Sequence, residues 1–143
     1  MAYDYIETVR DDAVLTIRMN RPDALNALIP PMLEELIEAL HRAENENGPS
    51  VLIIEGAGRA FSSGVDLKVL SGAKPKAGRV GSVFDEPASR LMQAVRASSK
   101  PVIAKVHGAC FTGALEFALH CDFIHTTTDT KFGDTHAKFA IRP

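Results

Sequence analysis

The residues best suited to chemistry in this 143-residue sequence lie at two junctions between an apolar run and a helical run. The first junction covers Val51–Asp66 and the second covers Val102–Glu116, and both contain glycine. A helix that begins after such a loop presents unpaired backbone N–H groups, and its dipole favours negative charge there. Two such junctions side by side could stabilise a carbonyl oxygen that becomes an oxyanion. The alternative is that Gly64 and Gly113 are ordinary turn residues.

Glu116 is the carboxylate with the clearest chemical interpretation. It follows Gly113 by three residues in the run Ala-Leu-Glu-Phe-Ala-Leu. We therefore expect a partly buried side chain, whose desolvation would suit an acid or base near neutral pH. A structural role is equally open, because with Gly113 as N-cap a glutamate at the third helical position favours the helix start.

Several other catalytic and binding motifs are absent from the sequence. Gly56-Ala57-Gly58 follows a strand-like run, but Phe61 stands where a dinucleotide-binding loop would have its third glycine. There is no phosphate-binding G-x-x-x-x-G-K-[ST] motif and no G-x-S-x-G nucleophile elbow. The five histidines form no H-x-x-x-H pair and the cysteines form no C-x-x-C pair, so no metal centre is expected.

The composition points to an ordinary soluble protein. The net charge is −2, and no basic stripe interleaved with aromatic residues indicates a nucleic-acid partner. No run approaches the roughly 18 apolar residues that span a bilayer, so no membrane partner is expected. The first residues do not resemble a signal peptide, and Cys110 and Cys121 do not form a disulfide framework. We therefore expect a cytoplasmic protein.

The elements that must position these residues alternate between strands and helices. Two alternating runs separated by Asp11-Asp12 predict a β-hairpin, and apolar residues at helical spacing predict a helix from about Pro31 to Gly48. Ser71–Ala88, rich in glycine and proline, is expected to be a mobile loop. Further strands are expected at 51–54, 101–106, 123–127 and 130–133, and further helices at 91–98 and 113–120. This alternation predicts a single domain of α/β layers over residues 1–143.

Four segments together resemble the enoyl-CoA hydratase/isomerase (crotonase) superfamily. Residues 20–28, N-R-P-D-A-L-N-A-L, resemble the family's N-R-P-x-x-x-N-A-[LM] signature. Residues 60–67, A-F-S-S-G-V-D-L, resemble its A-F-[CS]-x-G-x-D-L loop. Residues 100–108 resemble K-P-[VT]-I-A-x-[VI]-x-G, and residues 113–122 resemble G-G-x-E-[LF]-A-[LM]-x-[CS]-D. All four occur in the family's order and spacing, along nearly the whole chain.

The resemblance implies a spiral of ββα units, here without the family's C-terminal helices. It also implies that the amides of Val65 and Gly113 form the oxyanion hole for an acyl-CoA thioester. Coenzyme A is then part of the substrate, with no other cofactor, and the full-length form is a homo-oligomer, a trimer or dimer of trimers. The implied CoA-binding loop consists of Phe61, Ser62, Ser63, Gly64, Val65, Asp66 and Leu67.

Hydratases of this family use two glutamates, and the resemblance places the first at Glu116. The second falls in a segment that typically reads F-G-x-P-E, and His136 occupies that position here. A histidine can act as acid or base near neutral pH, whereas Asp134 would point the other way in a strand.

The sequence therefore predicts a hydratase or isomerase that acts on enoyl-CoA through a stabilised enolate. The alternative is a truncated, non-catalytic member that binds acyl-CoA or a partner protein. A related Clp-type serine peptidase is disfavoured, because Cys110, Phe111 and Thr112 occupy the place of its nucleophile.

Overall fold

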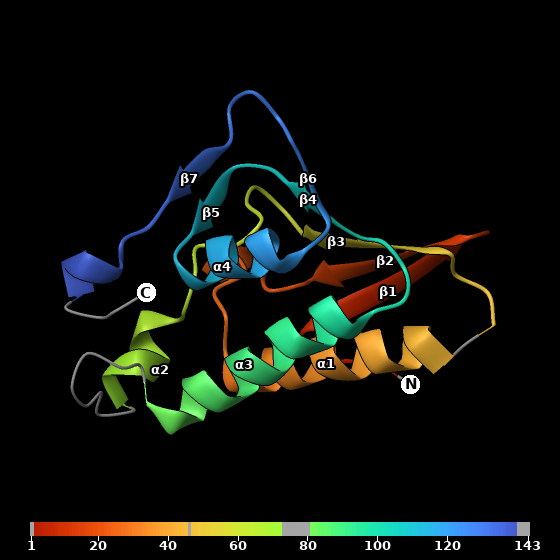
Figure 1. Cartoon of the computed structure of the whole chain (residues 1–143). Coiled ribbons are helices and arrows are strands. Elements are labelled where there is room, and N and C mark those ends of the chain that lie inside the picture. Colours follow the sequence, from red (N-terminus) through yellow and green to blue (C-terminus); the bar gives the residue numbers. More distant parts are fainter. Residues whose placement is uncertain (1, 46, 73–80, 140–143) are drawn as a thin grey trace.

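The computed structural model describes residues 2–45, 47–72 and 81–139, whose largest feature is a five-stranded sheet. The strand order is β1-β2-β3-β4-β6, with an antiparallel β1–β2 pair and parallel pairs elsewhere. The strands are β1 (Ile6–Asp11), β2 (Val14–Met19), β3 (Val51–Gly56), β4 (Val102–Val106) and β6 (Phe123–Thr126). Figure 1 shows this sheet above two long helices. The hairpin predicted around Asp11-Asp12 is confirmed.

A second, smaller layer of extended chain lies beside the first sheet. Its strands β5 (Ala109–Phe111) and β7 (Lys131–Gly133) pair in parallel. Two isolated parallel bridges, Leu28 with Val65 and Ser62 with Cys110, continue the same pattern. From β2 onward, each strand of the large sheet is therefore followed by a short passage through the small layer.

The chain accordingly forms a spiral in which strand, short extended segment and helix repeat. β2 leads through Leu28 to α1 (Pro30–Asn45). β3 leads through Ser62 to α2 (Leu67–Gly72) and α3 (Ser82–Ala97), and β4 leads through β5 to α4 (Gly113–His120). β6 leads through β7 to the 3-10 helix η2 (His136–Phe139). Another short 3-10 helix, η1 (Pro22–Ala24), precedes Leu28.

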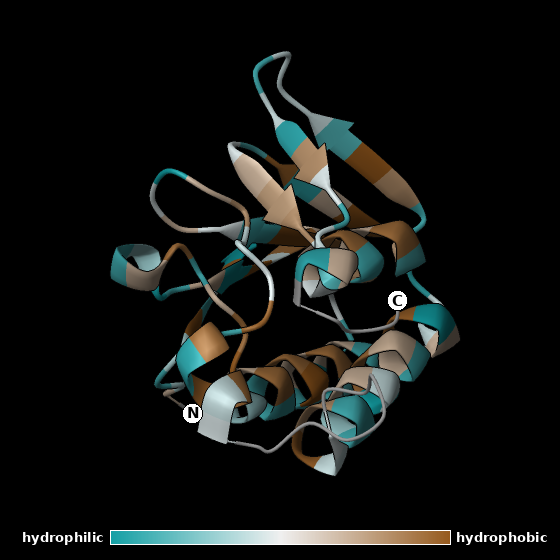
Figure 2. Cartoon of the chain, turned by 90° about the vertical axis from the view of Figure 1, so that its left-hand side faces the viewer, coloured by the Kyte–Doolittle hydropathy of each residue, from teal (hydrophilic) through white to brown (hydrophobic). Residues whose placement is uncertain are grey.

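The two long helices cover one face of the large sheet and bury the core. Apolar residues recur on one side of α1, among them Leu33, Leu36 and Leu40, and all three are buried. Figure 2 shows brown, hydrophobic segments on the strands and on α1. Fully buried side chains of Ile17, Leu52 and other strand residues face these helices. No helix of the described residues is long and apolar enough to cross a bilayer.

The prediction that Ser71–Ala88 forms a mobile loop is wrong for most of the described residues in that range. Residues 82–88 form the first turns of α3, while residues 73–80 lie outside the described part of the chain. The helix includes Pro87, and its buried face carries Phe84, Leu91 and Val95 at helical spacing. Packing of this face against α1 overrides the helix-breaking tendency of proline.

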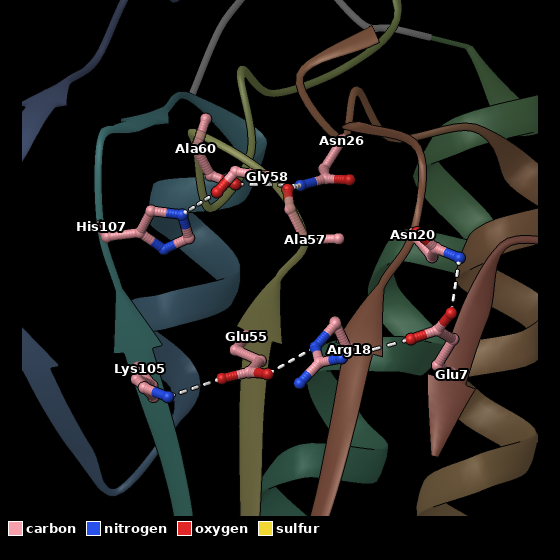
Figure 3. Close-up of polar contacts among 10 residues, drawn as sticks. All are labelled: Glu7, Arg18, Asn20, Asn26, Glu55, Ala57, Gly58, Ala60, Lys105 and His107. Carbon is pink, nitrogen blue, oxygen red and sulfur yellow. Dashed lines mark hydrogen bonds and ion pairs between the residues drawn. The ribbon is translucent and has the colours of Figure 1, made fainter. Parts of the chain in front are cut away.

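A row of charged residues crosses the large sheet on the side away from the core. Glu7, Arg18, Glu55 and Lys105 are aligned across β1, β2, β3 and β4, as Figure 3 shows. The Glu55 carboxylate accepts from Arg18 Nε at 2.6 Å and from Lys105 Nζ at 2.9 Å. Burial of Glu55 would raise its pKa, but these two hydrogen-bonded cations outweigh burial and lower it.

The side-chain amide of Asn26 connects the first turn of the spiral to the second. It is completely buried, and its Nδ2 donates to the carbonyl oxygens of Ala57 at 2.8 Å and Ala60 at 2.9 Å (Figure 3). Its Oδ1 accepts from the backbone N–H of Arg21 at 2.8 Å. Gly56 has no room for a β-carbon, which would lie 2.8 Å from Asn26 Nδ2. Asn26 therefore fixes the loop that leads to Val65.

We predict that Glu55→Gln lowers stability most near pH 7. Because the pKa of Glu55 is depressed in the folded protein, its contribution is present above the unfolded value of about 4.3 and is lost as the pH falls through the folded value. Denaturant titrations from pH 7 to pH 3 should show the wild-type advantage shrinking below about pH 4. A difference that stays constant with pH would contradict this explanation.

We predict that Asn26→Ala lowers the free energy of unfolding by about 3 kcal/mol, because three buried or partly buried backbone groups lose their partner. Asn20→Ala is the matched control, because Asn20 Nδ2 makes one exposed hydrogen bond to Glu7. Its cost should stay below about 1 kcal/mol. Equal losses for the two variants in denaturant titration would disprove the special role of Asn26.

Candidate functional site

The backbone of Val65 is oriented by a parallel bridge to Leu28. Leu28 donates its N–H to Gly64 O at 2.8 Å, and its carbonyl accepts from Asp66 N–H at 2.9 Å. In such a bridge the residue between the two bonded neighbours directs its own N–H away from the partner segment. Within the described residues the Val65 N–H makes no hydrogen bond. It is an unpaired donor.

Gly113 supplies a second unpaired donor at the first position of α4. The turn before it is unusual, because Thr112 adopts φ 47° and ψ −115°, outside the common regions for residues with a side chain. Its N–H donates to Gly133 O at 2.8 Å, and its carbonyl accepts from Glu116 N–H at 2.9 Å. Strain of this kind is concentrated at functional sites. The Gly113 N–H has no partner among the described residues.

The two residues that carry these donors lie close together, beside Glu116. A β-carbon placed on Gly113 would be 3.4 Å from Val65 Cγ2, 3.7 Å from Leu28 Cδ1 and 4.0 Å from Glu116 Oε2. Gly64 packs against the same turn, where a β-carbon would approach Thr112 Oγ1 to 2.3 Å. Segments from three turns of the spiral therefore converge here, and the two junctions singled out in the sequence are brought together.

Glu116 lies beside Gly113, and its side chain keeps 43% of its surface exposed, so the expectation of a partly buried carboxylate is confirmed. The expected capping role is wrong, however. The N-cap is Thr112 rather than Gly113, and its N–H donates to Gly133 O instead of the Glu116 carboxylate. A carboxylate without a structural partner on the helix is available to a ligand.

His136 is buried beside Glu116, with Nε2 3.9 Å from Glu116 Oε1. Its Nδ1 lies 2.5 Å from Asp134 Oδ1, which also accepts the His136 backbone N–H at 3.0 Å. The expectation that Asp134 points away is therefore wrong, because β7 ends at Gly133 and strand alternation no longer applies. The hydrogen bonds from the His136 backbone and ring lower the pKa of Asp134.

Most of the expected CoA-binding loop is committed to internal contacts. Phe61 is fully buried and its ring lies 6.4 Å from that of Phe117. The backbone N–H groups of residues 61–64 all donate within the chain. Asp66 caps α2 and pairs with Arg21 at 3.3 Å, and these contacts outweigh its burial and lower its pKa. Leu67 is half exposed. Contact of these residues with CoA stays a prediction.

The two thiols are poor nucleophiles, and a surface hollow of the described residues lies elsewhere on the molecule. Burial raises the pKa of both Cys110 and Cys121 to about 12, which leaves the thiols protonated. The described residues hold no cluster of three side chains arranged to ligate a metal. A hollow of about 550 Å³ lies over α1 and α3, lined by Glu34, Arg90 and neighbours, far along the chain from Glu116.

Sequence reasoning missed the residues that hold the site together. Leu28, Arg21 and Asn26 received no role, although all three lie in the N-R-P-D-A-L-N-A-L segment. The available signal was the pair of asparagines around η1, since a polar side chain inside an apolar run predicts a buried hydrogen-bonding role. The side chain of Asp134 was predicted to point the other way because a strand was expected there, but β7 ends at Gly133.

Comparison with known proteins identifies one family of relatives. Residues 9–143 match the profile of the family described as Enoyl-CoA hydratase/isomerase. A probable peroxisomal enoyl-CoA hydratase of Arabidopsis thaliana is 37% identical over 92% of this chain and 46% of its own length. The crotonyl-CoA hydratase of Syntrophomonas wolfei is 31% identical over the whole chain and 54% of its own length.

Solved structures agree with the sequence comparison. An enoyl-CoA hydratase/carnithine racemase from Magnetospirillum magneticum superposes with a TM-score of 0.92 at 34% identity, covering 99% of this chain and 53% of that one. The chain thus spans about half the length of the relatives it matches, and the expected crotonase fold is confirmed over that half. The chain belongs to the enoyl-CoA hydratase/isomerase family.

Proposed function

We propose that this chain binds an enoyl-CoA thioester and activates it for addition of water or for movement of its double bond. The observation that carries the proposal is the convergence of two unpaired amides, Val65 and Gly113, beside the partly exposed carboxylate of Glu116. Two fixed N–H donors stabilise a thioester oxygen as it gains charge, and a neighbouring carboxylate can take or return a proton.

In the proposed reaction the thioester oxygen lies between the Val65 and Gly113 amides. Attack on the double bond pushes its π electrons toward that oxygen and forms an enolate. The donors need no reorganisation, because the Leu28 bridge and the Thr112 turn already fix them. Coenzyme A enters as part of the substrate and not as a separate cofactor. Binding of CoA along residues 61–67 and assembly into a homo-oligomer belong to the same proposal.

A second candidate is acyl-CoA binding without turnover. It is favoured by His136, which stands where a typical family hydratase has its second glutamate. Hydration of crotonyl-CoA by the purified, mass-verified chain separates the two functions. Turnover above that of a Glu116→Gln variant supports the enzyme, whereas tight acyl-CoA binding with equal, background rates supports the binding protein.

We predict that Glu116→Gln lowers turnover at least tenfold, because general acid–base groups typically contribute about 10² to 10⁴ in rate. Stability should change by less than about 1 kcal/mol, since Glu116 caps no backbone group of α4. Steady-state kinetics and a melting curve measure the two effects. Glu86→Gln, an exposed glutamate on α3, is the control and should leave both unchanged. Full activity of Glu116→Gln would exclude Glu116 from the chemistry.

We predict that Gly113→Ala weakens acyl-CoA binding at least tenfold and leaves the fold intact. The added methyl group would meet its neighbours at ordinary distances of 3.4 Å or more, but it would fill the opening between Val65 and Glu116. Gly64→Ala is the contrasting variant, because φ is +96° there and a methyl group would collide with Thr112 Oγ1. Calorimetric titration with an acyl-CoA and thermal melting should separate a binding defect from a folding defect. Unchanged affinity in Gly113→Ala would show that the acyl-CoA binds elsewhere on the chain.

A further inference from the structure

Asp134, His136 and Glu116 lie in a row, with the His136 ring between the two carboxylates. Asp134 Oδ1 lies 2.5 Å from His136 Nδ1, and His136 Nε2 lies 3.9 Å from Glu116 Oε1. The His136 ring is only 10% exposed, whereas the two carboxylates remain in contact with solvent. Among the described residues these carboxylates are the charged groups that contact the ring, one from the turn after β7 and one from α4.

The Asp134 contact determines which ring nitrogen carries the proton. A carboxylate oxygen only accepts, so Nδ1 must donate to Asp134. The same oxygen accepts the backbone N–H of His136 at 3.0 Å, which holds the carboxylate in place. In the neutral ring Nε2 is then the free site, and it points toward Glu116. Second carboxylates fix histidine tautomers in this way in other catalytic sites.

The separation between Nε2 and Glu116 leaves space for one exchanging group. A distance of 3.9 Å is too long for a direct hydrogen bond. A water oxygen or substrate hydroxyl about 2.8 Å from each atom can bridge the two from one side. His136 and Glu116 can therefore act on one reactant together, and a proton can pass from one to the other afterwards.

We propose that Asp134 is a positioning residue that makes His136 the proton donor of a hydration reaction, with the Glu116 carboxylate as its base. This proposal rests on the proposed enoyl-CoA function. Glu116 takes a proton from water, and the water oxygen bonds to C3 of the enoyl thioester. The C2–C3 π pair moves to the thioester oxygen, held by the Val65 and Gly113 amides.

The enolate then collapses: the thioester C=O bond re-forms, and the electron pair at C2 takes the proton from Nε2 of the His136 imidazolium. The product is a 3-hydroxyacyl thioester, with a neutral imidazole and a protonated Glu116. Transfer of that proton from Glu116 to Nε2, through the bridging water position, restores the starting state. Asp134 remains ionised throughout and favours the imidazolium, which a carboxylate in place of His136 would not require.

The pH dependence follows from these protonation states. Activity requires ionised Glu116 and protonated His136, so it should rise and then fall with pH. Asp134→Asn removes the negative charge beside the imidazolium. Its alkaline limb should therefore move to lower pH by at least about half a unit, with kcat near neutral pH down about tenfold and KM within about twofold. Asp129→Asn, at an exposed aspartate in the β6–β7 connection, is the matched control and should leave the profile unchanged.

A double-mutant cycle separates positioning from a merely structural role. In a His136→Glu background the charge of Asp134 lies beside another carboxylate, so Asp134→Asn should no longer slow the reaction and should accelerate it. Loss of activity by the same factor in both backgrounds would overturn the proposal, as would an alkaline limb that Asp134→Asn does not move.

Nitrogen-15 NMR of the imidazoles gives a readout that does not depend on activity. His136 should show the Nδ1–H tautomer when neutral and lose that preference in Asp134→Asn, with its signals identified by their absence in His136→Gln. An Nε2–H tautomer in the unmodified chain overturns the positioning role. If the chain hydrates no enoyl thioester at any pH but shows the Nδ1–H tautomer, the proposed function fails while the assigned geometry of His136 holds.

Discussion

The buried amide of Asn26 is the interaction on which the site depends. One side chain satisfies three backbone groups from two turns of the spiral, those of Arg21, Ala57 and Ala60. Both Leu25 and Asn26 have positive φ, so the chain reverses there and brings Leu28 beside Gly64. The bridge at Leu28 then orients the Val65 amide. A polar group inside the core is costly unless fully bonded, so this network holds one arrangement of the loop in preference to others.

The elements with a clear local period could be predicted from the sequence. The hairpin, α1, the buried strands β3 and β4, and α4 all have patterns that a few neighbouring residues define. The beginning of α3 could not, because Pro87 and the glycines before it favour a loop until Phe84 is seen packed in the core. The three residues of β5 are too few for any period, and their pairing with β7 is a contact between distant segments.

The candidate site was predictable in its chain positions and less so in its environment. Both glycine junctions were found, because unpaired donors at a helix start are a local property. The partial burial of Glu116 was predictable from its apolar neighbours Phe117 and Ala118, which turn into the core. Its lack of a capping role was not, because the Thr112 N–H bonds to the distant Gly133 carbonyl. The orientation of Asp134 depends on where β7 ends, and alternation along a strand cannot show that.

The spiral brings residues from successive turns to the same corner, where main-chain and side-chain groups respond differently to substitution. The donors at Val65 and Gly113 belong to the main chain, so they persist through any side-chain replacement that keeps the backbone path. Glu116 and His136, the proposed proton-transferring groups, are side chains of α4 and η2, and neither amide depends on them. Under the proposed function, single substitutions at this corner would therefore change the reaction while the two amides keep one way of holding a thioester.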